Sequence, residues 1–247
     1  SSPYQGQGPG EITIIGHVGI DETNRRFFVS DHGKLKIFAY DLDSVLTTPE
    51  YQPSVKIDMK KKLFPDDYLY LNDTLCIAKI IEPIGNNDYK PSVARWNMAT
   101  GEINPMPYEY PDLKKVRFIY AASAEHQLYV QCYTQYDLMT ICDFNGNLKC
   151  NIYGPKWVNE KTQTQHYSLG VEFCGDKILA LYSGGDHRTD AYYPTKFLVF
   201  DLNGNYLKTL ETGYMITDFC YDKENNRLII NLNDEIQFAY LDLEGII

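Results

Sequence analysis

Eight side chains suited to ligand binding lie in two segments of the sequence, residues 154–167 and 183–195. Both segments mix aromatic rings with hydrogen-bonding groups. Tyr and Trp offer a large contact area at little cost in conformational entropy, so such a mixture suits a sugar ring or an extended peptide. The alternative is that the two segments only pack against each other. The predicted ligand-binding set is Trp157, His166, Tyr167, His187, Arg188, Asp190, Tyr192 and Tyr193.

Catalytic chemistry has weaker support in the sequence. His187 and Asp190 stand three residues apart, a spacing that could serve a metal ion or acid–base catalysis, but a single such pair is more typical of a solvated turn. The motifs of nucleophile elbows, phosphate-binding loops, dinucleotide folds and zinc proteases do not occur in the sequence. Glu172, Asp218 and Asp21 could line a channel, but they do not belong to a repeated set. The sequence predicts no metal and no cofactor, and favours a binding protein over an enzyme.

The composition excludes two classes of partner. The 247 residues include 33 acidic and 23 basic side chains, for a formal net charge of −10. Nucleic-acid binding requires clustered Lys and Arg to neutralise phosphates, so we expect no nucleic-acid partner. No apolar run reaches the roughly 18 residues that cross a bilayer, so we expect no membrane span. Tyrosine stands out, with 21 copies against 2 Trp.

The six cysteines are predicted to be free and mostly buried. Most lie among Leu, Ile, Tyr and Phe, where a free thiol behaves as a small apolar side chain. Their spacing fits neither a zinc site nor a dense disulfide framework. The residues are Cys76, Cys132, Cys142, Cys150, Cys174 and Cys220.

One strand pattern recurs five times along the chain. It consists of alternating apolar residues, then Asp or Asn, an apolar residue and a tight turn that usually contains Gly. The copies are LKIFAYDLDS (35–44), SVARWNMATG (92–101), LMTICDFNGN (138–147), KFLVFDLNGN (196–205) and IQFAYLDLEG (236–245). Successive copies are 41 to 58 residues apart. The turns fit hairpins, because Gly and Asn adopt the positive φ that a tight turn needs.

Two more strands precede each copy, and a shorter strand follows every copy except the last. The preceding pair is clearest at 15–21 and 26–31, and the following strand at 148–154 and 206–212. Few segments show a 3.6-residue period, so helix should be nearly absent. Four-stranded antiparallel units repeated at this interval are typical of a β-propeller. The sequence therefore predicts an all-β fold, a single propeller domain over 1–247.

The number of blades depends on the ends of the chain. The last unit stops at Ile247 after its third strand, and SSPYQGQGPGE (1–11) has the position of a fourth strand and the loop after it. We expect five blades, with residues 1–5 supplying the outermost strand of the last blade and closing the ring. The alternative is a six-bladed propeller whose N-terminal blade lies outside this chain.

Three short motifs resemble those of TolB-like and NHL-type propellers. They are GQGPGEI (6–12), DETNRRFFVSD (21–31) and DLNGNYLKTL (201–210). The resemblance covers essentially the full chain and implies a secreted, often lipid-anchored propeller of the TolB-like class. That family is six-bladed, whereas five units are legible here.

These patterns lead to one functional hypothesis and one alternative. The hypothesis is a non-enzymatic, exported propeller that binds a glycan, a peptide or a protein partner through the 154–167 and 183–195 loops on one face. The alternative is a channel-centred hydrolase or lactonase, with or without calcium. The resemblance implies a bacterial protein in the periplasm or attached to the outer membrane, with a lipid anchor upstream of Ser1.

Overall fold

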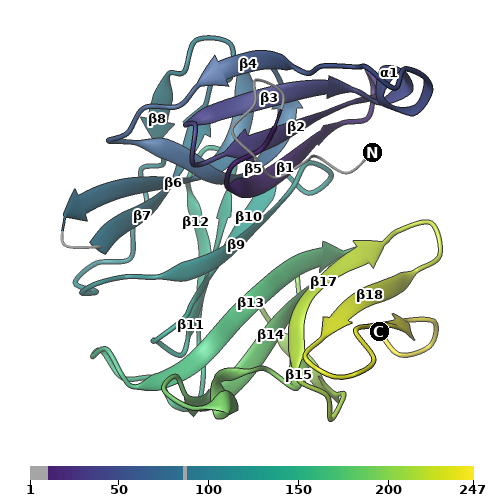
Figure 1. Cartoon of the computed structure of the whole chain (residues 1–247). Helices are drawn as coiled ribbons and strands as arrows, with labels where there is room; N and C mark the ends of the chain where they lie inside the picture. The colour runs from purple at the N-terminus through teal and green to yellow at the C-terminus, as the bar shows by residue number, and fades with distance from the viewer. Residues whose placement is uncertain (1–10, 86–87) are drawn as a thin grey trace. The chain divides into compact units, whose positions relative to one another are not determined.

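The computed structural model describes residues 11–85 and 88–247, and of Asp190 only its backbone. Strands dominate the described residues (Figure 1). Helical structure there is limited to a short helix, α1 (Leu42–Thr47), and one 3₁₀ turn, η1 (Asp190–Tyr192). The chain divides into two compact units, residues 1–107 and 108–247, which are described in turn.

The first unit contains two four-stranded sheets in which every neighbouring pair of strands is antiparallel. The strand order in each sheet follows the chain. The first sheet comprises β1 (Ile15–Asp21), β2 (Arg26–Asp31), β3 (Lys36–Asp41) and β4 (Ser54–Asp58). The second comprises β5 (Phe64–Asn72), β6 (Leu75–Gly85), β7 (Asp88–Trp96) and β8 (Ile103–Pro105).

The second unit contains three antiparallel sheets built in the same way. The first comprises β9 (Phe118–Ser123), β10 (Leu128–Tyr133), β11 (Leu138–Asp143) and β12 (Leu148–Tyr153). The next comprises β13 (Thr164–Cys174), β14 (Lys177–Asp186), β15 (Lys196–Asp201) and β16 (Tyr206–Glu211). The last has three strands, β17 (Ile216–Asp222), β18 (Arg227–Leu232) and β19 (Phe238–Asp242).

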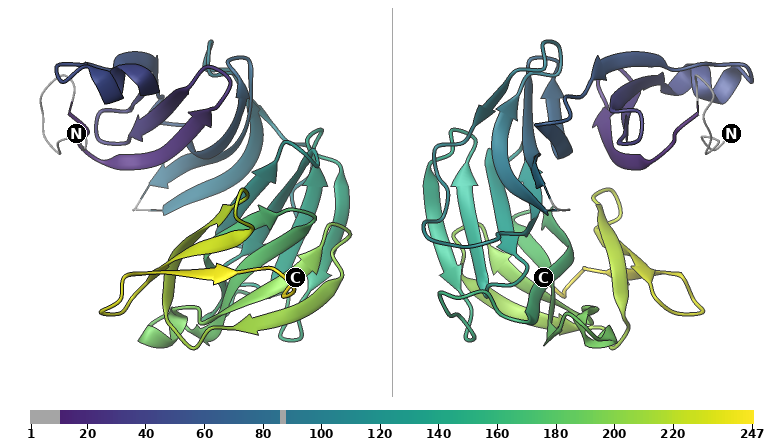
Figure 2. Two further views of the ribbon diagram at one scale, coloured as in Figure 1. Left: turned by 90° about the vertical axis from the view of Figure 1, so that its right-hand side faces the viewer. Right: turned by 60° about the vertical axis from the view of Figure 1, so that its left-hand side comes forward.

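Within the second unit the sheets stack face to face (Figure 2), and β13–β16 is covered on both sides. Ile178 and Ala180 of β14 join one apolar cluster with β9–β12, while Leu179 and Leu181 join another with β17–β19. Side chains alternate between faces along a strand. Because both faces are buried, the central strand reads as the continuous apolar run ILAL rather than as an alternation.

Carboxylates organise the turns that end the third strands. Asp143 accepts hydrogen bonds from the backbone N–H groups of Asn145 and Asn147 and from the Asn147 side chain. Asp201 makes the same contacts with Asn203 and Asn205. A tight turn leaves backbone N–H groups without a backbone acceptor. The Asp–apolar–Asn–Gly–Asn pattern thus recurs because the Asp carboxylate accepts the hydrogen bonds of these groups.

In two of the sheets, the turn between the first and second strands contains a second carboxylate motif, Asp-x-x-Asn-x-Arg. Asp21 accepts hydrogen bonds from Asn24, and its Oδ2 lies 2.6 Å from an Arg26 guanidinium nitrogen. In β17–β18, Asp222 binds Asn225 and Arg227 in the same way. The carboxylate therefore fixes the turn and pairs with the first cation of the next strand.

The structure confirms an all-β propeller fold with five blades, four of four strands and one of three, within the described residues. The predicted bounds of β1, β2 and β17 agree with the structure. The expected ring closure by residues 1–5 lies outside the described residues. The first third-strand turn differs from the others, because the helix α1, capped by Asp41, takes the place of a Gly turn.

Asp31 is the most completely buried carboxylate of the first unit, with none of its surface exposed. It accepts backbone hydrogen bonds from Thr13, Ile14, Gly33 and Lys34 at 2.9–3.1 Å. Burial acts to raise the pKa of Asp31, but these four donors together bring it below its usual value. The carboxylate thereby joins the segment before β1 to the β2–β3 turn.

We predict that Asp31→Ala destabilises the protein by about 3 kcal/mol, since it leaves four backbone donors without their acceptor. Urea unfolding of Asp31→Ala and of Asp201→Ala, a turn carboxylate that is more exposed than Asp31, measures the difference; the second should lose clearly less stability. Because the folded-state pKa of Asp31 is lowered, its stabilisation is present above pH 3.8 and is lost as the pH falls through the lowered value. Equal losses for the two variants would contradict the anchoring role.

Candidate functional site

The two segments predicted as ligand-binding loops are shorter than expected. β13 begins at Thr164 and β14 continues to Asp186, with Thr164 opposite Asp186 and Gln165 opposite Gly185. The segment TQTQHY lacks alternating apolar residues, so its strand comes from backbone pairing that the sequence pattern does not show. The connecting loops are residues 154–163 and 187–195.

The predicted site residues fall into three environments. His166 and Tyr167 lie on β13 with about 1% of their surface exposed, and Tyr167 packs edge-on against Tyr182 within the core. Trp157 is half-buried in the 154–163 loop. The remaining residues lie at or after the end of β14 and are His187, Arg188, Asp190, Tyr192 and Tyr193.

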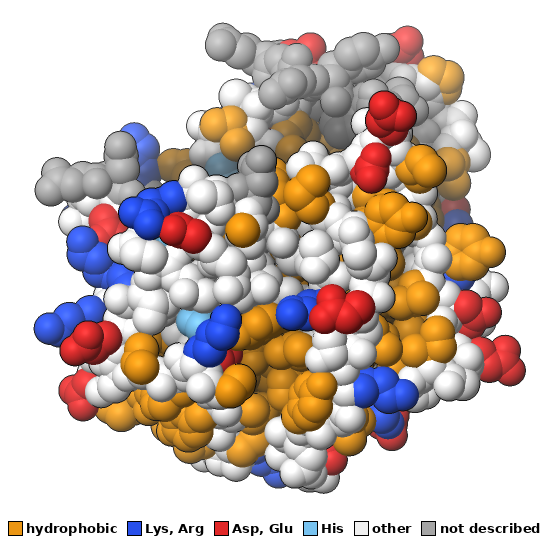
Figure 3. All heavy atoms as spheres, turned by 90° about the horizontal axis from the view of Figure 1, so that it is seen from below, with side chains coloured by type: hydrophobic (Ala, Val, Ile, Leu, Met, Phe, Trp, Pro, Cys, Tyr) orange, Lys and Arg blue, Asp and Glu red, His pale blue; other side chains and the backbone are white. Residues whose placement is uncertain are grey.

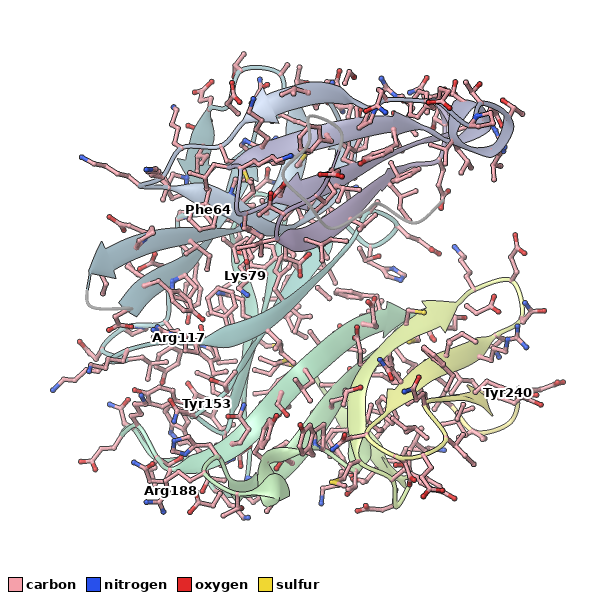
Figure 4. The ribbon with its side chains drawn as sticks, in the orientation of Figure 1. Phe64, Lys79, Arg117, Tyr153, Arg188 and Tyr240 are labelled. Atoms are coloured by element: carbon pink, nitrogen blue, oxygen red, sulfur yellow. The ribbon has the colours of Figure 1, made fainter. Side chains whose placement is uncertain are left out.

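Trp157 is surrounded by three tyrosines that lie outside the predicted set. Its ring centroid is 5.1 Å from that of Tyr153, 5.8 Å from Tyr110 and 6.3 Å from Tyr136. The hydroxyl oxygens of Tyr110 and Tyr153 are 3.3 Å apart, and this hydrogen bond raises the pKa of Tyr110 to about 12. Tyr153 is 50% exposed and is labelled in Figure 4. We call Tyr110, Tyr136, Tyr153 and Trp157 the Trp157 cluster.

The base of the Trp157 cluster is rigid. Tyr136 is buried, and its hydroxyl both donates to the Lys114 carbonyl at 2.8 Å and accepts from the Lys114 N–H at 3.2 Å. Asn151 on β12 donates to the Tyr108 hydroxyl at 2.8 Å and accepts from Thr140 at 2.7 Å. These bonds connect the 108–117 loop to β11, β12 and the β10–β11 turn, so the exposed rings stand on a fixed support.

The β10–β11 turn also holds both ends of the 154–163 loop. Asp137 accepts the Lys156 N–H at 2.9 Å through Oδ2, and its backbone carbonyl accepts the Gly154 N–H. Thr162 donates its N–H and its hydroxyl to the Gln135 carbonyl, and Gln135 donates its side-chain amide to the Thr162 carbonyl. A Cβ on Gly154 would lie 2.2 Å from the Asp137 carboxyl group. Only glycine allows this approach.

His166 and Asp137 form a buried polar group beneath the loop, each about 1% exposed. The His166 Nδ1 lies 3.2 Å from the Tyr182 hydroxyl and 3.7 Å from Asp137 Oδ1, and Nε2 lies 3.5 Å from the Thr162 hydroxyl. Burial lowers the pKa of His166, with a smaller contribution from the Lys156 charge, and outweighs the opposing charge of Asp137. Burial and the Asp137 charge also raise the pKa of Tyr182. His166 is therefore neutral at pH 7, and its position is structural rather than ligand-facing.

The 187–195 loop forms a separate group. The His187 N–H and Nδ1 both contact the Gln163 carbonyl, at 3.1 Å and 2.9 Å. Arg188 pairs with Asp186 at 2.7 Å, and its hydrogen bonds lower the pKa of that carboxyl. The rings of Tyr192 and Tyr193 lie 4.2 Å apart. The structure thus joins His187 to the end of the 154–163 loop, while Tyr192 and Tyr193 contact each other.

The parts of the chain that the structure describes contain no preformed set of metal ligands. No three or more His, Cys, Asp or Glu side chains lie there within reach of one ion. Of the six cysteines, all free, Cys76, Cys132, Cys142 and Cys174 are buried, as expected, Cys150 is half-buried and Cys220 is exposed.

Sequence reasoning missed Tyr110, Tyr153, Asp137 and Tyr182. Tyr110 lies in the 108–117 loop and Tyr153 at the end of β12, two segments far from residue 157 or outside the predicted loops, and no local pattern links them to Trp157. Asp137 carries no signal of its own in the turn TQYD. Its part in holding the loop is revealed in the structure, by its hydrogen bonds to Lys156 and Gly154 and by the close approach of Gly154.

We predict that Gly154→Ala loosens the 154–163 loop, because the added Cβ displaces the Asp137 carboxyl group. Hydrogen–deuterium exchange of residues 155–162 should accelerate about tenfold, as expected for a loss of about 1.4 kcal/mol of local stability. Gly175→Ala is the control, since it meets strain at φ +58° but no atom within 4 Å. It should leave exchange in the loop unchanged. Equal exchange in Gly154→Ala and the parent protein would contradict this account of the loop.

We also predict a histidine-dependent loss of stability at mildly acidic pH. The folded-state pKa of His166 lies below the ordinary value of 6.5, so the unfolded state binds more protons as the pH falls through that value. The free energy of unfolding should therefore decrease between pH 7.5 and 5.5, and His166→Gln should reduce this decrease. Urea titrations of both proteins at the two pH values measure it. A parallel decrease in both would show that His166 does not cause the loss.

The described residues contain no helix long and apolar enough to cross a membrane. The sequence family DUF5128, described as a 6-bladed beta-propeller, matches residues 3–74. No curated protein matches the chain at a significant level.

Solved structures similar to this chain share the propeller fold at low sequence identity. A member of the DUF4221 family from Bacteroides vulgatus has a TM-score of 0.63 and 12% identity, over 96% of this chain and 80% of that one. The extracellular domain of a protein assigned as a one-component system from B. thetaiotaomicron has a TM-score of 0.58 and 10% identity, over 94% of this chain. The chain spans only 28% of that protein's length.

A gluconolactonase from Xanthomonas campestris has a TM-score of 0.52 and 16% identity, over 88% of this chain and 69% of that one. At these identities the similarity shows the fold alone. The chain is thus a β-propeller with a sequence match, over its N-terminal part, to a family described as six-bladed.

Proposed function

We propose that this protein is an exported, non-enzymatic binding propeller whose ligand, a glycan or a peptide, lies across the Trp157 cluster. The observation that carries this proposal is the grouping of the half-exposed rings of Tyr110, Tyr153 and Trp157 on a rigid base. Their interplanar angles of 59–75° leave ring faces and edges directed in several directions. Such surfaces bind the apolar face of a sugar or an extended peptide, while the paired hydroxyls supply hydrogen bonds.

The charge of the two supporting loops favours an anionic ligand. Residues 108–117 and 154–163 together carry five basic and three acidic side chains, in a protein whose net charge is −10. Figure 4 labels Arg117, at the end of the first of these segments, and Tyr153, the last residue of β12. Hydrophobic side chains also reach the surface beside Lys and Arg on the face drawn in Figure 3. An acidic glycan or an acidic peptide would bind here with less repulsion than elsewhere on the chain.

Export belongs to the same proposal. The resemblance to TolB-like propellers and the extracellular domain among the similar structures support a location outside the cytoplasm, in the periplasm or attached to the bacterial outer membrane. A lipid anchor upstream of Ser1 would fit this location. The alternative function, a channel-centred hydrolase or lactonase, requires turnover of a lactone or glycoside.

We predict that Trp157→Ala weakens ligand binding about tenfold or more, because truncating a central aromatic side chain typically costs more than about 1.4 kcal/mol. Glycan and peptide arrays containing acidic members identify the ligand class, and calorimetry measures the affinity of each hit. Tyr153→Phe, which keeps the ring but removes one hydroxyl, should weaken binding by less.

Tyr192→Ala is the matched control, because Tyr192 lies in the other predicted segment, and should bind as the parent protein does. Unchanged binding by Trp157→Ala together with weakened binding by Tyr192→Ala would move the site to the 187–195 loop. Lactone or glycoside turnover by the parent protein would favour the enzymatic alternative.

A further inference from the structure

The His166 side chain contacts the anchor at each end of the 154–163 loop. Asp137 holds the start of the loop, because its Oδ2 accepts the Lys156 N–H at 2.9 Å. Thr162 holds the end of the loop through its hydrogen bonds to the β10–β11 turn. The His166 ring lies between these anchors, with Nδ1 3.7 Å from Asp137 Oδ1 and Nε2 3.5 Å from the Thr162 hydroxyl oxygen. One titratable side chain thus lies against both attachment points of the loop.

The Asp137 carboxyl group is not saturated with hydrogen bonds. Its Oδ1 is buried and accepts no hydrogen bond of good geometry from the described residues, although the Tyr182 hydroxyl lies near this carboxyl group. A neutral imidazole carries a proton on one nitrogen only, and the Nδ1 of His166 lies 3.2 Å from the same Tyr182 hydroxyl. A second proton on the ring would give Asp137 Oδ1 a charged donor.

Protonation of His166 therefore acts on Asp137. The 3.7 Å between Nδ1 and Oδ1 exceeds the roughly 3.2 Å of a good hydrogen bond, so one of the two groups has to move. The backbone of His166 is held by the Thr134 carbonyl, which accepts its N–H at 2.7 Å. The carboxyl group is thus the partner that moves toward the ring, and this movement draws Oδ2 away from the Lys156 N–H.

Two charged groups act on His166, and they come from different segments. Asp137 lies in the β10–β11 turn and Lys156 in the loop. The other titratable groups on this side of the described chain are the phenols of Tyr182 on β14 and of Tyr167 on β13. Burial has the largest effect and lowers the pKa of His166, Asp137 opposes this, and Lys156 lowers the pKa further. The closed loop therefore disfavours the protonated ring.

Opening of the loop would remove this penalty. The His166 side chain is only 1% exposed beneath the closed loop, and water would reach the ring once residues 154–163 lift away. The pKa of the ring would then return toward its ordinary value of 6.5. A proton binds the open loop more tightly than the closed one, and a ligand shifts an equilibrium toward the state that it binds better. Acid should therefore open the loop.

The residue that follows the first anchor is Trp157. Its ring lies 5.1 Å from that of Tyr153 and 6.3 Å from that of Tyr136, and its N–H donates to the Gly154 carbonyl at 3.0 Å. The Lys156 N–H bond is the adjacent attachment to the rest of the sheet. When that bond is released, Trp157 loses its fixed position against the two tyrosines.

We propose that His166 is a proton switch for the 154–163 loop: the neutral ring keeps the loop attached, and the protonated ring releases it together with Trp157. The release of the loop follows from the contacts around His166 alone. Its consequence for a ligand, weaker binding at mildly acidic pH, rests on the function proposed for the Trp157 cluster.

Hydrogen–deuterium exchange of residues 155–162 at pH 7.5 and 5.5 tests the switch on the protein alone. Protection factors, from which the intrinsic pH dependence of exchange is divided out, should fall several-fold at the lower pH. The upper limit is about tenfold, because a proton bound only by the open loop gains a factor of about ten per pH unit below 6.5.

Two histidine variants identify the sensor. His166→Gln should show equal protection of the loop at the two pH values. His187→Gln is the matched control, since His187 is exposed and contacts the Gln163 carbonyl at the end of the same loop, and it should respond as the parent does. Equal protection of the parent loop at both pH values would overturn the proposal. A response that is lost in His187→Gln and kept in His166→Gln would overturn it as well.

Two further measurements report on the parent chain, so the test does not depend on the folding of a variant. In an NMR titration, the His166 ring and the Lys156 amide should change with the same midpoint, below pH 6.5. Acrylamide should quench tryptophan fluorescence more strongly at pH 5.5, and this change reports on Trp157, because Trp96 is only 2% exposed. A Lys156 amide that does not follow the His166 ring would overturn the proposal.

None of these measurements involves a ligand. A loop that responds to pH in a protein that binds no member of the glycan and peptide arrays would support the switch and contradict the proposed function. A ligand that binds through Trp157 to a loop with no response to pH would do the reverse.

Discussion

Burial of both faces of a β-sheet is the constraint on which the rest of this structure depends. An isolated two-stranded hairpin is marginal in water, and independent stability needs further strands and an apolar face that can be covered. In the second unit, β13–β16 meets this requirement through sheets on both sides, and β14 contributes Ile178 and Ala180 to one and Leu179 and Leu181 to the other. Each Leu or Ile side chain so buried contributes roughly 1.5–3 kcal/mol of transfer free energy. The repeat is thus a chain of mutually dependent layers rather than a set of independent hairpins.

The acidic composition follows in part from the turns that such layers need. Every blade requires several tight connections, and each leaves backbone N–H groups that a carboxylate can accept. Asp143 and Asp201 do this after third strands, and Asp21 and Asp222 do it within first hairpins. Asp143 and Asp201 thus add negative charge for the sake of chain reversal, without reference to a ligand, whereas Asp21 and Asp222 are balanced by Arg26 and Arg227.

The sequence predicts the strands well where one physical signal dominates. Period-two alternation locates β1 and β17, and the Asp–apolar–Asn–Gly turn locates the ends of β11 and β15. The polar start of β13 lacks that signal, because its ladder depends on backbone bonds and on irregular pairing around Leu169, whose φ is +66°. The candidate site was predicted only through Trp157. Its partners come from other segments, and no local pattern encodes which loops become neighbours.

The tyrosines that stood out in the composition have two roles, and the extent of their burial distinguishes them. Tyr129 and Tyr167 lie fully within the core, and burial raises the pKa of each phenol. Such side chains act as packing residues. Tyr110 and Tyr153, by contrast, keep part of each ring in water while β12, the 108–117 loop and Tyr136 fix their positions. Binding to rings that are already ordered costs less conformational entropy than binding that must first order a free loop. The 154–163 loop is tied at both ends to the β10–β11 turn, so the Trp157 ring belongs to this ordered support. The 187–195 loop is held by other partners, Ser183 and Asp186 of β14 and the Gln163 carbonyl, and its two tyrosines contact each other rather than the Trp157 cluster.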